Sequence, residues 1–409
     1  MQEEQVLSES PQAKWKRYAA LFITSQGITL FGSSVVQMAI IWQVALETSS
    51  GLWVTLLTLS STIPQVILSL FGGVWADKYP RKRLIILADA WIALVTLALA
   101  LVFMIGAAEN ILPLIIGISA LRSVGAGIQT PAVNATIPQI VPEKHLMRYN
   151  GINSSMMSIV QFAAPAAAGA ILYLAPFYTV LLIDVATAVI GISILALVII
   201  RPVTTTNSEP GESFFAELAS GIRYAAHEKS IRRLLLTFGA FIFLSVPSGF
   251  LAVLMIERTF GDSYFYLTIN EMAGFAGMVL GGILLGTWGG FTKRYKTLVL
   301  GLIGYSVFSF AIGFTGVFWL FATFMFLLCF CIPLVQSSTT TMLQEQVPPE
   351  KMGRVFGLFG IMYSGFMPLG MVLFGPLADV VRIQTMIIVC GIVLLLLGVC
   401  VIAWNRKNR

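Results

Sequence analysis

The chain has 409 residues, of which 57% are hydrophobic and only 11% are charged, with a mean hydropathy of +0.87 and a formal net charge of +6. Soluble globular domains carry about 25% charged residues, so this composition excludes an ordinary soluble protein. The basic residues lie at the ends of apolar stretches and not in one patch, which favours a role in membrane orientation over nucleic-acid binding.

Apolar stretches long enough to cross a bilayer recur along the whole chain. A helix needs about 20 apolar residues to span the roughly 30 Å hydrocarbon core. We therefore predict an all-α, polytopic membrane protein with 12 transmembrane helices. The predicted spans are residues 18–46, 52–76, 84–107, 111–136, 151–173, 177–200, 231–256, 265–289, 297–316, 318–344, 355–378 and 384–404.

Lysines and arginines are concentrated in every second loop. One set of alternate loops, with the two chain ends, holds 22 of the 25 basic residues. The other loops hold only Arg258 and Arg382, and Arg122 lies inside a span. Because cytoplasmic loops are enriched in Lys and Arg, the pattern predicts that both termini are cytoplasmic.

The first span carries a stripe of polar side chains and no acid. Gln26, Thr29, Ser33 and Gln37 follow one another at three or four residues, so they share one face of a helix. We expect this stripe to line a central cavity, and a hydrogen-bonded seam between helices is the structural alternative.

A charged loop joins the second and third spans. Gly73 permits close backbone approach at the end of the second span, and Asp77 precedes a basic cluster that includes Arg81. Asp89 lies early in the third span. We expect Asp89 to join Asp77 and Arg81 in a network on the cytoplasmic side.

Isolated charged residues occur in the fourth, sixth and eighth spans: Arg122, Asp184 and Glu271. A charge near the centre of the bilayer costs at least about 2.5–3.5 kcal/mol, so such a side chain faces a cavity or a partner. A carboxyl in an apolar helix can also exchange a proton. Asp184 and Glu271 are therefore candidates for proton coupling, and bracing between helices is the alternative for all three residues.

The longest polar gap, residues 201–230, divides the chain. Its first part predicts a flexible linker, and the apolar spacing from Phe214 to Ala225 predicts an amphipathic helix on the cytoplasmic face. Residues 1–200 and 231–409 then form two six-helix bundles. Val141, Pro142, Arg148 and Gly151 recur at a constant offset of 206 positions (141 to 347), which indicates duplication of a six-span unit.

Several of these segments carry a family resemblance. The loop from Gly73 to Arg83 resembles the cytoplasmic signature of the major facilitator superfamily: a Gly, three residues, an Asp and a basic cluster. Residues 37–41, 122–135, 183–185 and 277–282 look like those of bacterial macrolide-efflux exporters in that superfamily.

The resemblance implies an architecture and a set of roles. It implies drug export across a bacterial cytoplasmic membrane, driven by protons, with Arg122 at the position linked to coupling. Asp77 and Arg81 would latch the cytoplasmic side. The segment Ala164 to Gly169 is similar to the antiporter signature of the fifth helix, represented here by Pro165 and Gly169.

We expect a monomeric secondary transporter that exports small amphipathic, macrolide-type molecules in exchange for protons. Its partners would be the substrate, protons and the lipid bilayer, without nucleic acid, metal or cofactor. Export of a siderophore and transport of a lysophospholipid are the alternatives. A receptor would need a soluble domain, for which there is no room. An enzyme is not expected, because neither histidine nor any of the four cysteines forms a catalytic group.

Overall fold

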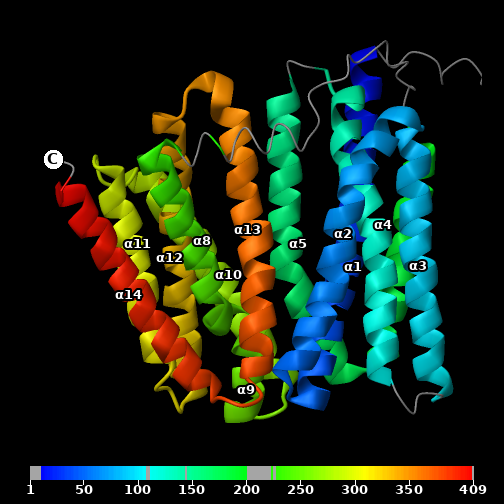
Figure 1. The fold of residues 1–409 in the computed structure, drawn as a ribbon. Helices are drawn as coiled ribbons and strands as arrows, with labels where there is room; N and C mark the ends of the chain where they lie inside the picture. The colour runs from blue at the N-terminus through cyan, green and yellow to red at the C-terminus, as the bar shows by residue number, and fades with distance from the viewer. Residues whose placement is uncertain (1–10, 107–110, 143–144, 200–222, 224–226, 408–409) are drawn as a thin grey trace, which may run out of the picture. The chain divides into compact units, whose positions relative to one another are not determined.

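The structure is a computed structural model and describes residues 11–106, 111–142, 145–199, 223 and 227–407 (Figure 1). Across these residues it contains helices and no strand, and 12 helical segments are long and apolar enough to cross a membrane. The predicted all-α, twelve-span fold is confirmed. The expected amphipathic helix at 214–225 lies almost entirely outside the described residues.

The chain folds into two compact units. The first comprises Met1–Gln43 and Leu56–Asn207, and the second comprises Val44–Thr55 and Ser208–Arg409. The end of the first helix and the start of the second therefore belong to the second unit, although they lie early in the chain.

Six helices make up or enter the first unit: α1 (Pro11–Thr48), α2 (Gly51–Lys78), α3 (Arg81–Ile105), α4 (Ile111–Ile140), α5 (Leu146–Leu174) and α6 (Phe177–Leu197). Within it α3 lies beside α4 (Figure 1) and packs against both α4 and α6. Where α1 crosses α6, Gly32 faces Thr187 and Gly191 faces Thr29, so small residues allow the backbones to approach closely.

The second unit contains α8 (Lys229–Gly249), α9 (Ala252–Phe260), α10 (Tyr264–Trp288), α11 (Arg294–Ile312), α12 (Phe318–Gln346), α13 (Pro349–Leu377) and α14 (Ile383–Lys407). Here α12 packs against α10 and α11, and α14 packs against α11 and α8.

The seventh span is interrupted, which differs from the single helix predicted over 231–256. It breaks between α8 and α9 after Pro247, which has no N–H to donate. The amide of Leu251 bonds the carbonyl of Val246, five residues back, before the ladder resumes from Met255 to Leu251. A local change of register of this kind bends a helix.

Replacing each of two glycines on α4 with alanine should affect stability differently. A Cβ at Gly127 would lie 2.8 Å from the carbonyl oxygen of Gln65 and 2.9 Å from Cβ of Leu68, both on α2. Overpacking of this kind costs about 1–3 kcal/mol, so Gly127→Ala is expected to lower the melting temperature of the purified protein.

Gly117→Ala is the matched control, because nothing lies within 4 Å of a Cβ there. Alanine removes backbone freedom from the unfolded chain, so this variant should be neutral or slightly more stable. Equal melting temperatures for the two variants would show that α2 and α4 are not in close contact at Gly127.

Candidate functional site

A polar cavity of about 340 Å³ lies inside the first unit. Hydroxyl and amide side chains from α1, α2 and α4 line most of it, with Arg122 as the one charged side chain among the lining residues. The polar lining residues are Thr29, Ser33, Gln37, Thr58, Ser61, Thr62, Gln65, Ser119, Arg122, Ser123, Gln129 and Thr130. Such a surface offers many hydrogen bonds to a ligand that carries hydroxyl, ether or carbonyl groups.

The predicted stripe on α1 divides between the cavity and the protein interior. Thr29, Ser33 and Gln37 line the cavity. Gln26 is buried and is not among the lining residues, and its amide donates to the hydroxyl of Ser25, 3.3 Å away.

Arg122, which lines this cavity, forms a buried ion pair with Asp184. Nη1 of Arg122 lies 2.6 Å from Oδ2 of Asp184, and the two side chains are 8% and 2% exposed. Thr96 on α3 accepts from Arg122 and donates to Oδ2 of Asp184 at 3.1 Å. Ser33 on α1 donates to Oδ1 at 3.1 Å. The network joins four helices and neutralises the arginine.

Asp89 lies apart from that pair. It is 3% exposed, and its Oδ1 accepts a hydrogen bond from Nε2 of Gln129 at 2.6 Å. Its Oδ2 is buried and has no hydrogen-bond partner among the described residues. We expect from the sequence that Asp89 joins the Asp77 and Arg81 network; in the structure its hydrogen bond comes from Gln129 on α4, the helix against which α3 packs.

Arg81 supports the chain at the start of α3. Its Nε donates to the carbonyl of Ala76 at 2.8 Å, and Nη1 donates to the carbonyl of Ala135 on α4. These bonds satisfy carbonyls near two helix ends, where cations are favourable. Gly73 and Asp77 lie in α2, but their side chains are outside the described part of the structure.

The remaining predicted site residues lie elsewhere. Pro165 and Gly169 are both buried within α5. Glu271 is partly buried on α10 in the second unit, and no hydrogen bond or ion pair reaches it from the described residues. The geometry therefore brings Arg122 to Asp184 and leaves Glu271 in the other unit.

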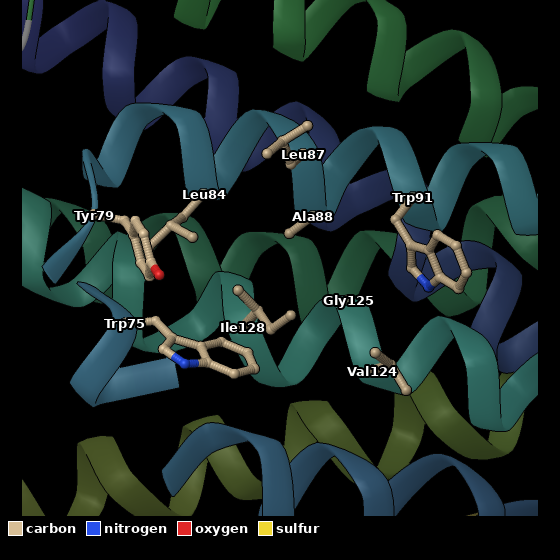
Figure 2. A pocket seen from close by; sticks show the side chains of 9 residues that line it. All are labelled: Trp75, Tyr79, Leu84, Leu87, Ala88, Trp91, Val124, Gly125 and Ile128. Atoms are coloured by element: carbon tan, nitrogen blue, oxygen red, sulfur yellow. The ribbon is translucent and has the colours of Figure 1, made fainter. Parts of the chain in front are cut away.

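A second cavity, of about 510 Å³, is apolar (Figure 2). It lies between the end of α2, one face of α3 and α4, and is lined by Trp75, Tyr79, Leu84, Leu87, Ala88, Trp91, Val124, Gly125 and Ile128. We call it the Trp75–Trp91 cavity. Sequence reasoning missed it, although Leu84, Leu87, Ala88 and Trp91 have the spacing of a single helix face.

A polar network closes the turn between α1 and α2 inside the second unit. Asp379 accepts from the amides of Gly51 at 2.7 Å and Leu52 at 3.1 Å, and from the hydroxyl of Ser50 at 2.8 Å. It is therefore an N-cap for α2 supplied from a distant part of the chain. Arg258 bonds Asp379 at 3.2 Å and also donates to the carbonyl of Ser49.

This network lowers the pKa of Asp379. Partial burial raises its pKa, but hydrogen bonds from the Gly51 and Leu52 amides, the Ser50 hydroxyl and the Arg258 guanidinium outweigh that effect. The pKa therefore lies below the ordinary value for an aspartate, because these groups favour the charged form.

Replacing Asp379 with alanine is expected to lower stability by about 1 kcal/mol, as loss of an N-cap does. Because the folded pKa is depressed, the charged cap contributes fully above the ordinary aspartate pKa of about 3.9 and is lost as the pH falls through the folded value. The difference in melting temperature between wild type and variant should be constant near neutral pH and shrink in acid. Asp262→Ala, at an exposed acid in the same unit, should show no such difference.

The sequence matches the model of a family described as transmembrane secretion effector over residues 10–407. The chain belongs to this family of the major facilitator superfamily. Macrolide efflux protein A of Streptococcus pyogenes is 29% identical over 394 residues, covering 94% of this chain and 95% of the relative. Macrolide efflux protein A of Enterococcus faecalis is 30% identical, covering 77% and 98%.

More distant proteins agree on the fold of this family member. The staphyloferrin A transporter of Staphylococcus aureus is 23% identical, covering 95% of this chain and 96% of the relative. A crystal structure of a bacterial homologue of the iron transporter ferroportin, in an inward-facing state, superimposes with a TM-score of 0.71 at 17% identity. That match covers 97% of this chain and 99% of the other. The predicted superfamily membership is confirmed, and the chain is a multi-pass membrane protein of a transporter family.

Proposed function

We propose that this protein exports amphipathic, macrolide-type compounds across a bacterial cytoplasmic membrane in exchange for protons. The observation that carries the proposal is the similarity to two macrolide efflux proteins along most of the chain. Both termini would be cytoplasmic, as the alternation of basic loops indicates.

The polar cavity supports a ligand of this chemical class. Its hydroxyl and amide lining suits the ether, ester and hydroxyl groups of a glycosylated lactone. Thr29, Ser33 and Gln37 would contact the ligand from α1. The single cation among its lining residues is already neutralised by Asp184, so the cavity does not favour an anion.

Proton coupling requires acids that can change their charge. Asp184 and Glu271 remain the candidate acids, with Arg122 as the cation paired to Asp184, and Asp89 joins them because it is buried without a cation among the described residues. We propose that Asp89 exchanges the proton and that Gln129, which lines the cavity and bonds Asp89, connects it to the substrate. The Arg122 and Asp184 pair would set the electrostatic potential around Asp89 and Gln129.

On the cytoplasmic side, Gly73, Asp77 and Arg81 would form the latch, with Pro165 and Gly169 shaping α5. The hydrogen bond from Arg81 to the carbonyl of Ala135 supports this proposal, because it ties the loop before α3 to α4.

Siderophore export is the second candidate, since the staphyloferrin A transporter is a relative over most of the chain. Anionic siderophores would need unpaired cations in the binding cavity. Among the residues that line the polar cavity only Arg122 is a cation, and its charge is already paired. We therefore favour the macrolide-type substrate.

The proposal is tested by uptake of a labelled macrolide into inverted membrane vesicles that contain the protein. Uptake should rise when the vesicle interior is acidified and collapse when a protonophore removes the gradient. Uptake that ignores the gradient would contradict antiport. Uptake of an iron-free siderophore in place of macrolide would transfer the assignment to the second candidate.

A further inference from the structure

The Trp75–Trp91 cavity has the chemistry of a site for a hydrocarbon chain. None of its nine lining residues is charged. The indole N–H of Trp91 is already bound to the carbonyl of Leu121 at 2.8 Å, so this ring offers its apolar face and not its donor. Transfer of a hydrocarbon chain into such a surface is favourable and needs no polar partner.

The cavity opens on the outside of the helix bundle beside α3, which is long and apolar enough to cross a membrane. Leu87 is 66% exposed and Trp91 is 40% exposed, and both belong to the membrane-spanning helix α3. From Leu84 to Trp91 the face runs for about 10 Å along the helix axis. Figure 2 shows Trp75 and Tyr79 at one end of this face and Trp91 at the other. An acyl chain lying along α3 would enter it directly from the membrane.

Positive charge gathers at the Trp75 and Tyr79 end. Residues 77–83 hold four cations against one acid. Two of the cations already bind carbonyls, since Arg81 donates to Ala76 and Lys82 donates to Ala196 and Val198. Lys78 and Arg83 are exposed, and neither has an ion pair with any described residue.

Charge selects among the amphiphiles that could occupy this cavity. Two exposed cations beside its end repel a cationic amphiphile and attract an anionic headgroup, by about fivefold in affinity for each cation. A free phosphate would make no use of the apolar walls. We propose that the Trp75–Trp91 cavity binds an acyl chain of an anionic phospholipid whose headgroup is held by Lys78 and Arg83.

Quenching of tryptophan fluorescence by brominated lipids tests this site, because Trp75 and Trp91 line it. The full-length protein is reconstituted into phosphatidylcholine vesicles that contain a small fraction of brominated phosphatidylglycerol or brominated phosphatidylcholine. Phosphatidylglycerol should quench at a several-fold lower mole fraction in the wild type. Lys78→Gln/Arg83→Gln should lose that preference. Lys293→Gln/Lys296→Gln is the matched control at an exposed basic pair in the second unit and should keep it.

A second arm locates the site. In Trp75→Phe/Trp91→Phe the quenching that is specific to phosphatidylglycerol should disappear, while quenching by phosphatidylcholine at the remaining tryptophans persists. Equal quenching by the two lipids in the wild type would overturn the proposal. So would a preference that survives the change at Lys78 and Arg83, or one that remains undiminished without the two tryptophans. None of these readouts depends on transport, so they stand whatever the exported substrate proves to be.

Discussion

Replacing Arg122 with alanine is expected to destabilise the protein by about 3–5 kcal/mol and to abolish export. The substitution leaves Asp184 buried, 2% exposed in its side chain, with two hydroxyl donors and without its cation. Removing one partner of a buried pair is costly because the other charge stays in a medium that solvates it poorly. The melting temperature of the purified protein and macrolide resistance in cells are the two measurements.

The double variant Arg122→Gln/Asp184→Asn separates structure from transport. It buries two neutral amides in place of two charges, so most of the lost stability should return. Export should not return if the pair sets the electrostatics of the cavity. A double variant that regains both stability and export would show that the pair only braces α4 against α6.

Replacing Asp89 with asparagine is expected to uncouple export from the proton gradient while leaving substrate exchange intact. The asparagine side chain would keep the hydrogen bond from Gln129 and resembles the protonated acid in size and charge, so the cavity should keep its shape. It cannot release a proton. One proton moving down a gradient of one pH unit is worth about 1.4 kcal/mol, or about tenfold accumulation of substrate, and the variant should lose this factor.

Two transport modes in proteoliposomes check this expectation. Accumulation driven by a pH gradient should fall to the level without a gradient, whereas exchange of labelled for unlabelled macrolide at equal pH should continue. Glu271→Gln is the informative comparison, because Glu271 is also an intramembrane acid without an ion pair among the described residues. If Asp89→Asn still accumulated substrate with the gradient and Glu271→Gln did not, the proton would be carried in the second unit.

For the charged residues, the sequence identifies which ones are buried in the membrane but not all of their partners. Arg122, Asp184 and Asp89 stand out in the sequence because each lies in an apolar span, where an isolated charge is costly. The structure pairs Arg122 with Asp184 and not with Glu271. Asp89 is close to Asp77 and Arg81 along the chain, but its Oδ1 accepts a hydrogen bond from Gln129 on α4, a partner that the sequence does not indicate.

Contacts between residues far apart in the chain cannot be predicted from local sequence patterns either. Nothing near Gly51 in the chain marks Asp379 as its capping residue, 328 positions away. Likewise, residues from α2, α3 and α4 together form the walls of the Trp75–Trp91 cavity, so the cavity cannot be recognised until the packing of these helices is known.

Hydropathy alone predicts the all-α class and the twelve spans, because the bilayer forces each apolar stretch of sufficient length into a helix whose backbone bonds are satisfied within it. The motifs between and within those spans indicate the superfamily. Which face of each helix meets which neighbour is known only from the folded structure. The orientation of each helix about its own axis depends on packing against its neighbours, and hydropathy carries no information about it. That orientation determines the partners of Arg122, Asp89 and Asp379.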